Sequence, residues 1–172
     1  MQQHLWAPWR MAYLQDLVAR ERDGGGEAKP TCFLCEAAKA EVDSALARQH
    51  HVLINDDRGV LMLNLYPYTT GHLLVVPPDH VGRLNDLSPE ARAGLMALAA
   101  EAEALLERTF HPQGHNIGMN LGRAAGAGVP GHLHLHVVPR WHGDTNFMSV
   151  AGDIRVVPES IEATWQRLRE AL

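Results

Sequence analysis

Short apolar runs alternate with turn-forming residues through the middle of the chain, a pattern typical of strands joined by tight connections. These runs predict strands at residues 52–55, 60–65, 72–76, 115–121, 132–138 and 153–157. The segment Asp56-Asp57-Arg58-Gly59 separates the first two runs and predicts a hairpin. Pro77 and Pro78 end the third run, since proline cannot donate to a strand ladder.

A helical spacing of apolar residues replaces this pattern after residue 88. Ser88-Pro89-Glu90 is typical of a helix start, with a capping serine, a proline in the first turn and an acid near the positive end of the dipole. Apolar residues then follow at intervals of four and three, namely Ala91, Leu95, Leu98, Ala102 and Leu105. This spacing predicts a long helix that packs one face on a sheet.

Shorter helical segments are expected elsewhere in the chain. They comprise a helix or docking arm at 5–18, an Ala/Glu-rich segment at 36–46, and a C-terminal helix from 158 onward. Residues 23–30 (DGGGEAKP) predict an exposed loop between the first two. Strands with one long crossing helix predict an α+β fold with a mainly antiparallel sheet.

Composition and length narrow the class of protein. A chain of 172 residues with 46% hydrophobic residues fits a single domain spanning 1–172, with an arm at 1–50, a core at 51–140 and an extension at 141–172. The formal net charge of −5 disfavours nucleic acid as a partner, and no apolar run approaches the roughly 20 residues that cross a bilayer. Cys32 and Cys35 are too close in sequence to join distant segments, which favours a reducing, cytoplasmic location.

Three of the 11 histidines alternate with apolar residues in the segment 132–138 (HLHLHVV). Strand alternation predicts that His132, His134 and His136 share one face, while the leucines between them face the core. Successive histidine Cα atoms would lie roughly 6.6 Å apart, which disfavours one metal bound by all three. A row of imidazoles suits an extended charged ligand such as a polyphosphate.

Neutral imidazole is a competent nucleophile toward phosphorus, and a neighbouring ring can donate hydrogen bonds to phosphoryl oxygens. The small residues Gly126-Ala127-Gly128 before this segment allow backbone N–H groups to approach phosphate. Two alternatives are a surface strand with fortuitous histidines and a two-histidine metal site. The second would require a nearby glutamate, and residues 139–144 contain none.

The pair Cys32-x-x-Cys35 is by itself compatible with a redox pair, half of a zinc site, or two unrelated thiols. A redox pair is expected at a helix start in a βαβ context, whereas this pair follows a glycine-rich loop. Tetrahedral zinc would need two further ligands from elsewhere in the chain.

The segment HLHLHVV resembles the signature of the histidine triad family. Further segments resemble the family's ligand-binding strands, namely Leu63-Asn64-Leu65-Tyr66-Pro67 and Gly71 to Pro77. Others resemble its bacterial diadenosine tetraphosphate phosphorylase branch, namely Trp9 to Tyr13, Asn120 to Arg123, Pro139-Arg140-Trp141 and Asp144 to Met148. Together these motifs cover most of the chain.

The resemblance implies a nucleotidyl hydrolase or transferase that forms a covalent nucleotidyl-histidine. It assigns nucleophilic attack to His134 and contacts with the phosphate and the leaving group to His136. His72 would complete the set of polar side chains around the phosphate. It further implies nucleotide contacts from Asn64, at the ribose, Asn120 and Gly128. Gly128 stands where many members carry Gln or Ser, so a side-chain donor to the leaving group is missing there.

The resemblance also implies a structural zinc ion held by Cys32, Cys35, His80 and His132, and a homodimer with one continuous sheet. A divalent cation accompanying the polyphosphate is a second possible cofactor. We expect phosphorolysis of diadenosine tetraphosphate to ADP and ATP. Hydrolysis of dinucleoside polyphosphates, cleavage of nucleoside phosphoramidates, and nucleotide sensing without turnover are the alternatives.

Overall fold

The computed structural model describes residues 32–144 and 159–172, which belong to one compact unit. The elements in chain order are α2 (Phe33–Ala38), α3 (Ala45–Gln49), β1 (Val52–Asp56), β2 (Gly59–Leu63), β3 (Leu73–Val76), η1 (Leu84–Asp86), α4 (Pro89–Phe110), β4 (Gly114–Gly118), η2 (Arg123–Ala125), β5 (Leu135–Arg140) and α6 (Ile161–Glu170). The expected elements at 5–18, 23–30 and 153–157 lie outside the described residues. The expected single domain also includes these residues and stays a prediction.

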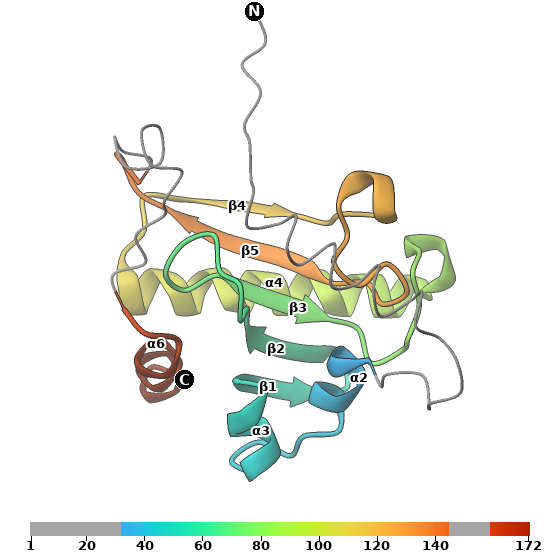
Figure 1. Cartoon of the computed structure of the whole chain (residues 1–172), viewed down its shortest axis with the longest axis horizontal. Helices are drawn as coiled ribbons and strands as arrows, with labels where there is room; N and C mark the ends of the chain where they lie inside the picture. The colour runs from blue at the N-terminus through green and yellow to red at the C-terminus, as the bar shows by residue number, and fades with distance from the viewer. Residues whose placement is uncertain (1–31, 145–158) are drawn as a thin grey trace, which may run out of the picture. The chain divides into compact units, whose positions relative to one another are not determined.

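The five strands form one antiparallel sheet in the order β1-β2-β3-β5-β4, and α4 packs against one of its faces (Figure 1). This arrangement confirms the α+β fold with a mainly antiparallel sheet and one long helix. The predicted hairpin is present, with Asp56 paired to Gly59. The predicted helix start is also present, because the Ser88 hydroxyl accepts a hydrogen bond from the Ala91 N–H at 3.1 Å.

Hydrophobic residues are buried on both faces of the sheet. One core lies between the sheet, α4 and α6, and it includes Leu61, Val75 and Val137. The second core lies on the other face, beneath α2 and α3, and it includes Met62 and Leu74. Alternation along each strand therefore decides which side chains face α4 and which face the α2 side.

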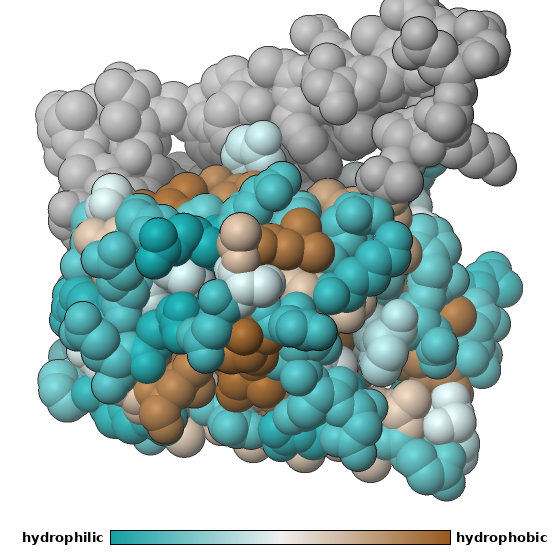
Figure 2. All heavy atoms as spheres, turned by 90° about the horizontal axis from the view of Figure 1, so that it is seen from below, coloured by the Kyte–Doolittle hydropathy of each residue, from teal (hydrophilic) through white to brown (hydrophobic). Residues whose placement is uncertain are grey.

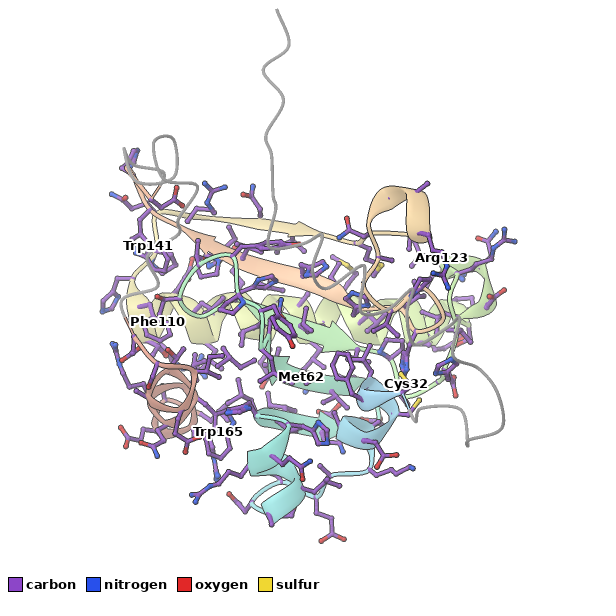
Figure 3. The ribbon with its side chains drawn as sticks, viewed as in Figure 1. Cys32, Met62, Phe110, Arg123, Trp141 and Trp165 are labelled. Carbon is purple, nitrogen blue, oxygen red and sulfur yellow. The ribbon has the colours of Figure 1, made fainter. Side chains whose placement is uncertain are left out.

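The C-terminal helix α6 contacts the edge strand β1 of this sheet. Trp165 is 1% exposed, and its indole N–H donates to the Val52 carbonyl of β1 at 3.0 Å (Figure 3). Ser160 caps the helix, which confirms the expected C-terminal helix and places its first residue at Ile161.

Three sequence expectations need correction. The segment 36–46 forms no continuous helix: α2 ends at Ala38 and α3 begins at Ala45, because Asp43 takes a positive φ of 75° and Ser44 caps a new helix. The strand expected to run to 121 ends at Gly118. The strand expected from 132 begins only at Leu135.

The surface seen from below is mainly hydrophilic, with small separate apolar patches (Figure 2). Among the described residues, no helix combines the length and apolar character that crossing a bilayer requires.

Candidate active site

Of the three alternating histidines, His132 and His134 directly precede β5 and His136 lies within it. Leu133, Leu135 and Val137 are at most 5% exposed and belong to the core beneath α4, as the alternation predicted. The histidines therefore face the α2 side. His132 turns toward the cysteines, whereas the rings of His134 and His136 stay together with centroids 5.1 Å apart.

His134 is held in one tautomer by its own main chain. Its Nδ1 lies 3.0 Å from the His132 carbonyl oxygen, which can only accept a hydrogen bond, so Nδ1 carries the proton. The Nε2 atom of the neutral ring then keeps its lone pair. The side chain is buried, with the residue 8% exposed, so the ring has little freedom to turn away.

A second chain of hydrogen bonds orients His136. The Tyr68 backbone N–H donates to His72 Nδ1 at 3.1 Å, so the proton of His72 is on Nε2. His72 Nε2 lies 3.0 Å from His136 Nδ1 and donates to it. Neutral His136 therefore carries its proton on Nε2, the nitrogen remote from His72, where it is a donor.

His72 is neutral in this series of hydrogen bonds. It is fully buried, and burial, followed by the proximity of His136 and His134, lowers its pKa to about 3. A protonated His72 would have a hydrogen on Nδ1 facing the Tyr68 N–H, which would break the relay. The low pKa thus keeps the donor direction from His72 to His136 fixed.

Tyr68 is a site residue that sequence reasoning missed. Its ring stacks on His136 at a centroid distance of 6.0 Å and an interplanar angle of 25°, and lies 4.7 Å from the His72 ring. The available signal was an aromatic residue four positions before His72, in a turn bounded by Pro67 and Gly71.

Asn64 is bound within the loop that leads to His72. Its Oδ1 accepts the Tyr66 N–H at 3.0 Å, and its Nδ2 lies 3.3 Å from His72 Nδ1 and 3.4 Å from His72 Nε2. The amide therefore orders this loop. Its predicted ribose contact stays a prediction, as do the nucleotide contacts of Asn120, just after β4, and of Gly128, in the loop before β5.

The structure brings together all four residues expected to hold a metal, with their ligand atoms within 4.8 Å of one another. Cys35 Sγ lies 3.1 Å from His80 Nδ1 and 3.4 Å from His132 Nδ1, and Cys32 Sγ lies 3.5 Å from His132 Nδ1. Cys32 is the residue that precedes α2 (Figure 3). Tetrahedral zinc with ordinary bond lengths separates sulfur and nitrogen ligands by roughly 3.5 Å, so the spacing fits the ion.

The protonation of these ligands also fits a metal. His132 Nε2 donates to the Pro77 carbonyl at 3.1 Å, which leaves the lone pair on Nδ1, the atom that faces the sulfurs. Burial lowers the pKa of His132 and therefore keeps the ring neutral. Without a cation, burial and the neighbouring Cys32 raise the pKa of Cys35, and a bound divalent ion would reverse that effect.

His132 links the two sites. Its ring belongs to the cysteine cluster, while its carbonyl oxygen orients His134. The Leu133 N–H donates to the Val81 carbonyl at 2.7 Å, one residue beyond His80, so the two histidine segments are joined through the main chain as well. This hydrogen bond therefore couples the position of the metal ligands to the start of β5.

Comparison with known proteins shows what this chain is similar to. The family model described as HIT domain matches residues 46–143. The chain is 38% identical over 162 residues to AP-4-A phosphorylase of Mycobacterium tuberculosis (strain ATCC 25618 / H37Rv), covering 94% of this chain and 80% of that protein. It is also similar to the crystal structure of a Zn-bound histidine triad family protein from Mycobacterium smegmatis, with a TM-score of 0.64 and 32% identity, covering 82% of this chain and 92% of that one.

Proposed function

Because the chain belongs to the HIT domain family, we propose that it is a nucleotidyltransferase that cleaves dinucleoside polyphosphates through a nucleotidyl-His134 intermediate. The substrate is diadenosine tetraphosphate, and inorganic phosphate is the acceptor, so that the products are ADP and ATP. The similarity to AP-4-A phosphorylase supports the substrate. The observation that carries the chemistry is the 3.0 Å contact of His134 Nδ1 with the His132 carbonyl, which leaves Nε2 as the nucleophile.

In the first step His134 Nε2 attacks the α-phosphorus. A phosphorus–nitrogen bond forms, the bridging phosphorus–oxygen bond breaks, and ATP leaves with the bond's electron pair. The His134 ring keeps its Nδ1 proton and becomes cationic, and the His132 carbonyl stabilises that charge. No proton has to leave the nucleophile, because its lone pair is already available.

His136 assists this step as a donor. The hydrogen bonds from Tyr68 to His72 and from His72 to His136 place the proton of His136 on Nε2. In this proposal that N–H donates a hydrogen bond to a phosphoryl oxygen or to the leaving oxygen. His72 touches His136 rather than the substrate, so its role in this proposal is to position His136.

In the second step an oxygen of inorganic phosphate attacks the same phosphorus. The phosphorus–nitrogen bond breaks, ADP is released, and the His134 ring returns to the neutral form. Water in place of phosphate would give AMP, which is the hydrolase alternative. A nucleoside phosphoramidate would enter the first step through cleavage of its own phosphorus–nitrogen bond, which is the phosphoramidase alternative.

Asn64, Asn120 and Gly128 are the nucleotide-binding positions in this proposal, with Asn64 at the ribose, and a divalent cation accompanies the polyphosphate. Zinc on Cys32, Cys35, His80 and His132 is structural, since four protein ligands leave no position for substrate. When bound, it supplies a cross-link between α2 and the segment before His134. A homodimer and a cytoplasmic location complete the proposal, and β4, which forms an edge of the described sheet, supports pairing of two copies.

Incubation of the protein with diadenosine tetraphosphate and radiolabelled inorganic phosphate tests the reaction. The label should enter ADP and not ATP, because phosphate becomes the second phosphoryl group of ADP only. His134→Ala should abolish the transfer, whereas His111→Asn, which removes an exposed histidine beyond α4, should not change it. Unlabelled AMP as the product would reject phosphorolysis in favour of hydrolysis.

The remaining candidate is a nucleotide sensor without turnover. Bound diadenosine tetraphosphate that is recovered intact after long incubation with phosphate would favour the sensor over the enzyme. The tautomer of His134 argues against it, because a pure binding site has no need of an aligned nucleophile.

A further inference from the structure

A second group of metal-ligating side chains lies on the opposite face of the sheet from the histidines of the active site. It consists of Glu103 and Glu107 on α4 and His115 on β4, which we call the α4–β4 cluster. His115 pairs with Pro139 of β5. Pro139 is two residues beyond Val137, whose side chain lies in the core beneath α4, so Pro139 and its partner His115 face α4 as well. His136 faces the other side, and the two sites are therefore separate.

The geometry of the α4–β4 cluster brings one donor atom from each residue together. Glu103 and Glu107 are four residues apart, so their side chains lie on the same face of α4. One ligand atom from each of the three residues lies within 4.8 Å of the others. His115 Nδ1 is 3.6 Å from Glu103 Oε1, which is too long for a hydrogen bond but close to the separation of two ligands on one ion.

His115 supplies a second, independent observation, because its side chain is buried and its Nδ1 faces Glu103 at a distance too long for a hydrogen bond. Its side chain is 6% exposed, and its buried Nε2 has no hydrogen-bond partner in the described part of the chain. Among the described residues, its Nδ1 has only the long contact with Glu103. A buried imidazole with neither nitrogen hydrogen-bonded is rare, and an ion or an ordered water is the usual explanation.

The two carboxylates also lack a protein cation. Glu101, on the same helix, binds Arg58 at 2.9 Å, whereas within residues 32–144 and 159–172 neither Glu103 nor Glu107 is ion-paired with a lysine or arginine. Two acids at this spacing repel each other on an isolated helix. A divalent cation would remove that repulsion and give His115 a partner.

We propose that the α4–β4 cluster binds one divalent transition-metal ion, such as Mn²⁺, through Glu103, Glu107 and a ring nitrogen of His115. Two carboxylate oxygens and one imidazole form a ligand set for a hard or borderline ion, unlike the thiolates of the cysteine cluster. Water completes the coordination, because the carboxylates are partly exposed. The ion fastens the edge strand β4 to α4. This site does not depend on the proposed reaction.

Titration of the zinc-loaded full-length protein with Mn²⁺ tests the proposal, with the electron paramagnetic resonance signal of free Mn²⁺ as the measure of binding. One Mn²⁺ should bind per chain. Glu107→Gln should weaken binding by about tenfold or more, since it removes a ligand. Glu107 is exposed, so this change leaves the fold intact.

Two controls locate the site. Glu101→Gln removes a carboxylate from the same helix but outside the cluster, and Cys32→Ser disrupts the cysteine cluster; both should keep Mn²⁺ binding. Bound Mn²⁺ should also broaden the ring-proton signals of His115 more than those of His80. Absence of Mn²⁺ binding, or equal affinity in wild type and Glu107→Gln, would overturn the proposal.

Discussion

The free energy of unfolding should fall steeply in acid because of His72. In the folded chain its pKa is about 3, against about 6.5 in an unfolded chain. Below pH 6.5 the unfolded chain takes up a proton on this residue and the folded chain does not. Stability from His72 is therefore fully present above pH 6.5 and is lost as the pH falls toward 3.

The magnitude follows from the two pKa values. Each pKa unit corresponds to about 1.4 kcal/mol, so the 2.5 units between pH 6.5 and pH 4 give a loss of about 3 kcal/mol. The total stability of a domain is about 5–15 kcal/mol, so this loss is a large fraction of it. Other histidines whose pKa is lowered by burial, including the partly buried His51, add to the acid sensitivity, and comparison with a variant is needed.

His72→Gln isolates the contribution of His72, because glutamine keeps a polar side chain and does not ionise. Unfolding of both proteins by urea would be followed by circular dichroism at pH 7, 6, 5 and 4 and constant ionic strength. The variant should be less stable at pH 7, and its disadvantage should shrink by about 3 kcal/mol at pH 4. Protonation of the metal ligands affects both proteins and cancels in the difference. A disadvantage that stays constant over this range would refute the reasoning.

Two further predictions concern residues around the histidines. Tyr68→Ala should lower kcat about three- to tenfold, because it removes the ring stacked on His136. Tyr68→Phe keeps the ring, so its kcat should stay near that of the wild type. Equal rates for all three proteins in steady-state assays would contradict the stacking role. Cys32→Ser should lose zinc, measured by elemental analysis, and should lower both the melting temperature and kcat, because His132 joins the metal cluster to His134. Full zinc content in this variant would contradict the ligand set.

Local patterns predicted the parts of the fold that depend on neighbouring residues. The apolar spacing after Ser88 placed α4, and the turn residues Asp56 to Gly59 placed the first hairpin. The boundaries were less accurate, as the late start of β5 shows. His132 N–H bonds to the Val129 carbonyl and Leu133 N–H to the Val81 carbonyl, so a turn and a distant loop decide where the strand begins.

The sequence by itself determined which residue types could do the chemistry and which face of β5 each would occupy. In any strand, alternation places His134 and His136 on one face and Leu135 and Val137 on the other, independently of the rest of the chain. The motif resemblance also identified the four residues of the cysteine cluster.

Only the tertiary structure decided the proton positions on the active-site histidines. The tautomer of His136 depends on His72, 64 residues earlier, and that of His72 depends on the Tyr68 backbone N–H. The tertiary structure also placed His115 near Glu103 and Glu107, with no hydrogen bond to its buried Nε2 from any described residue. Hydrogen bonds require atoms within about 3 Å, and sequence spacing does not specify distances between segments that meet only in the folded chain.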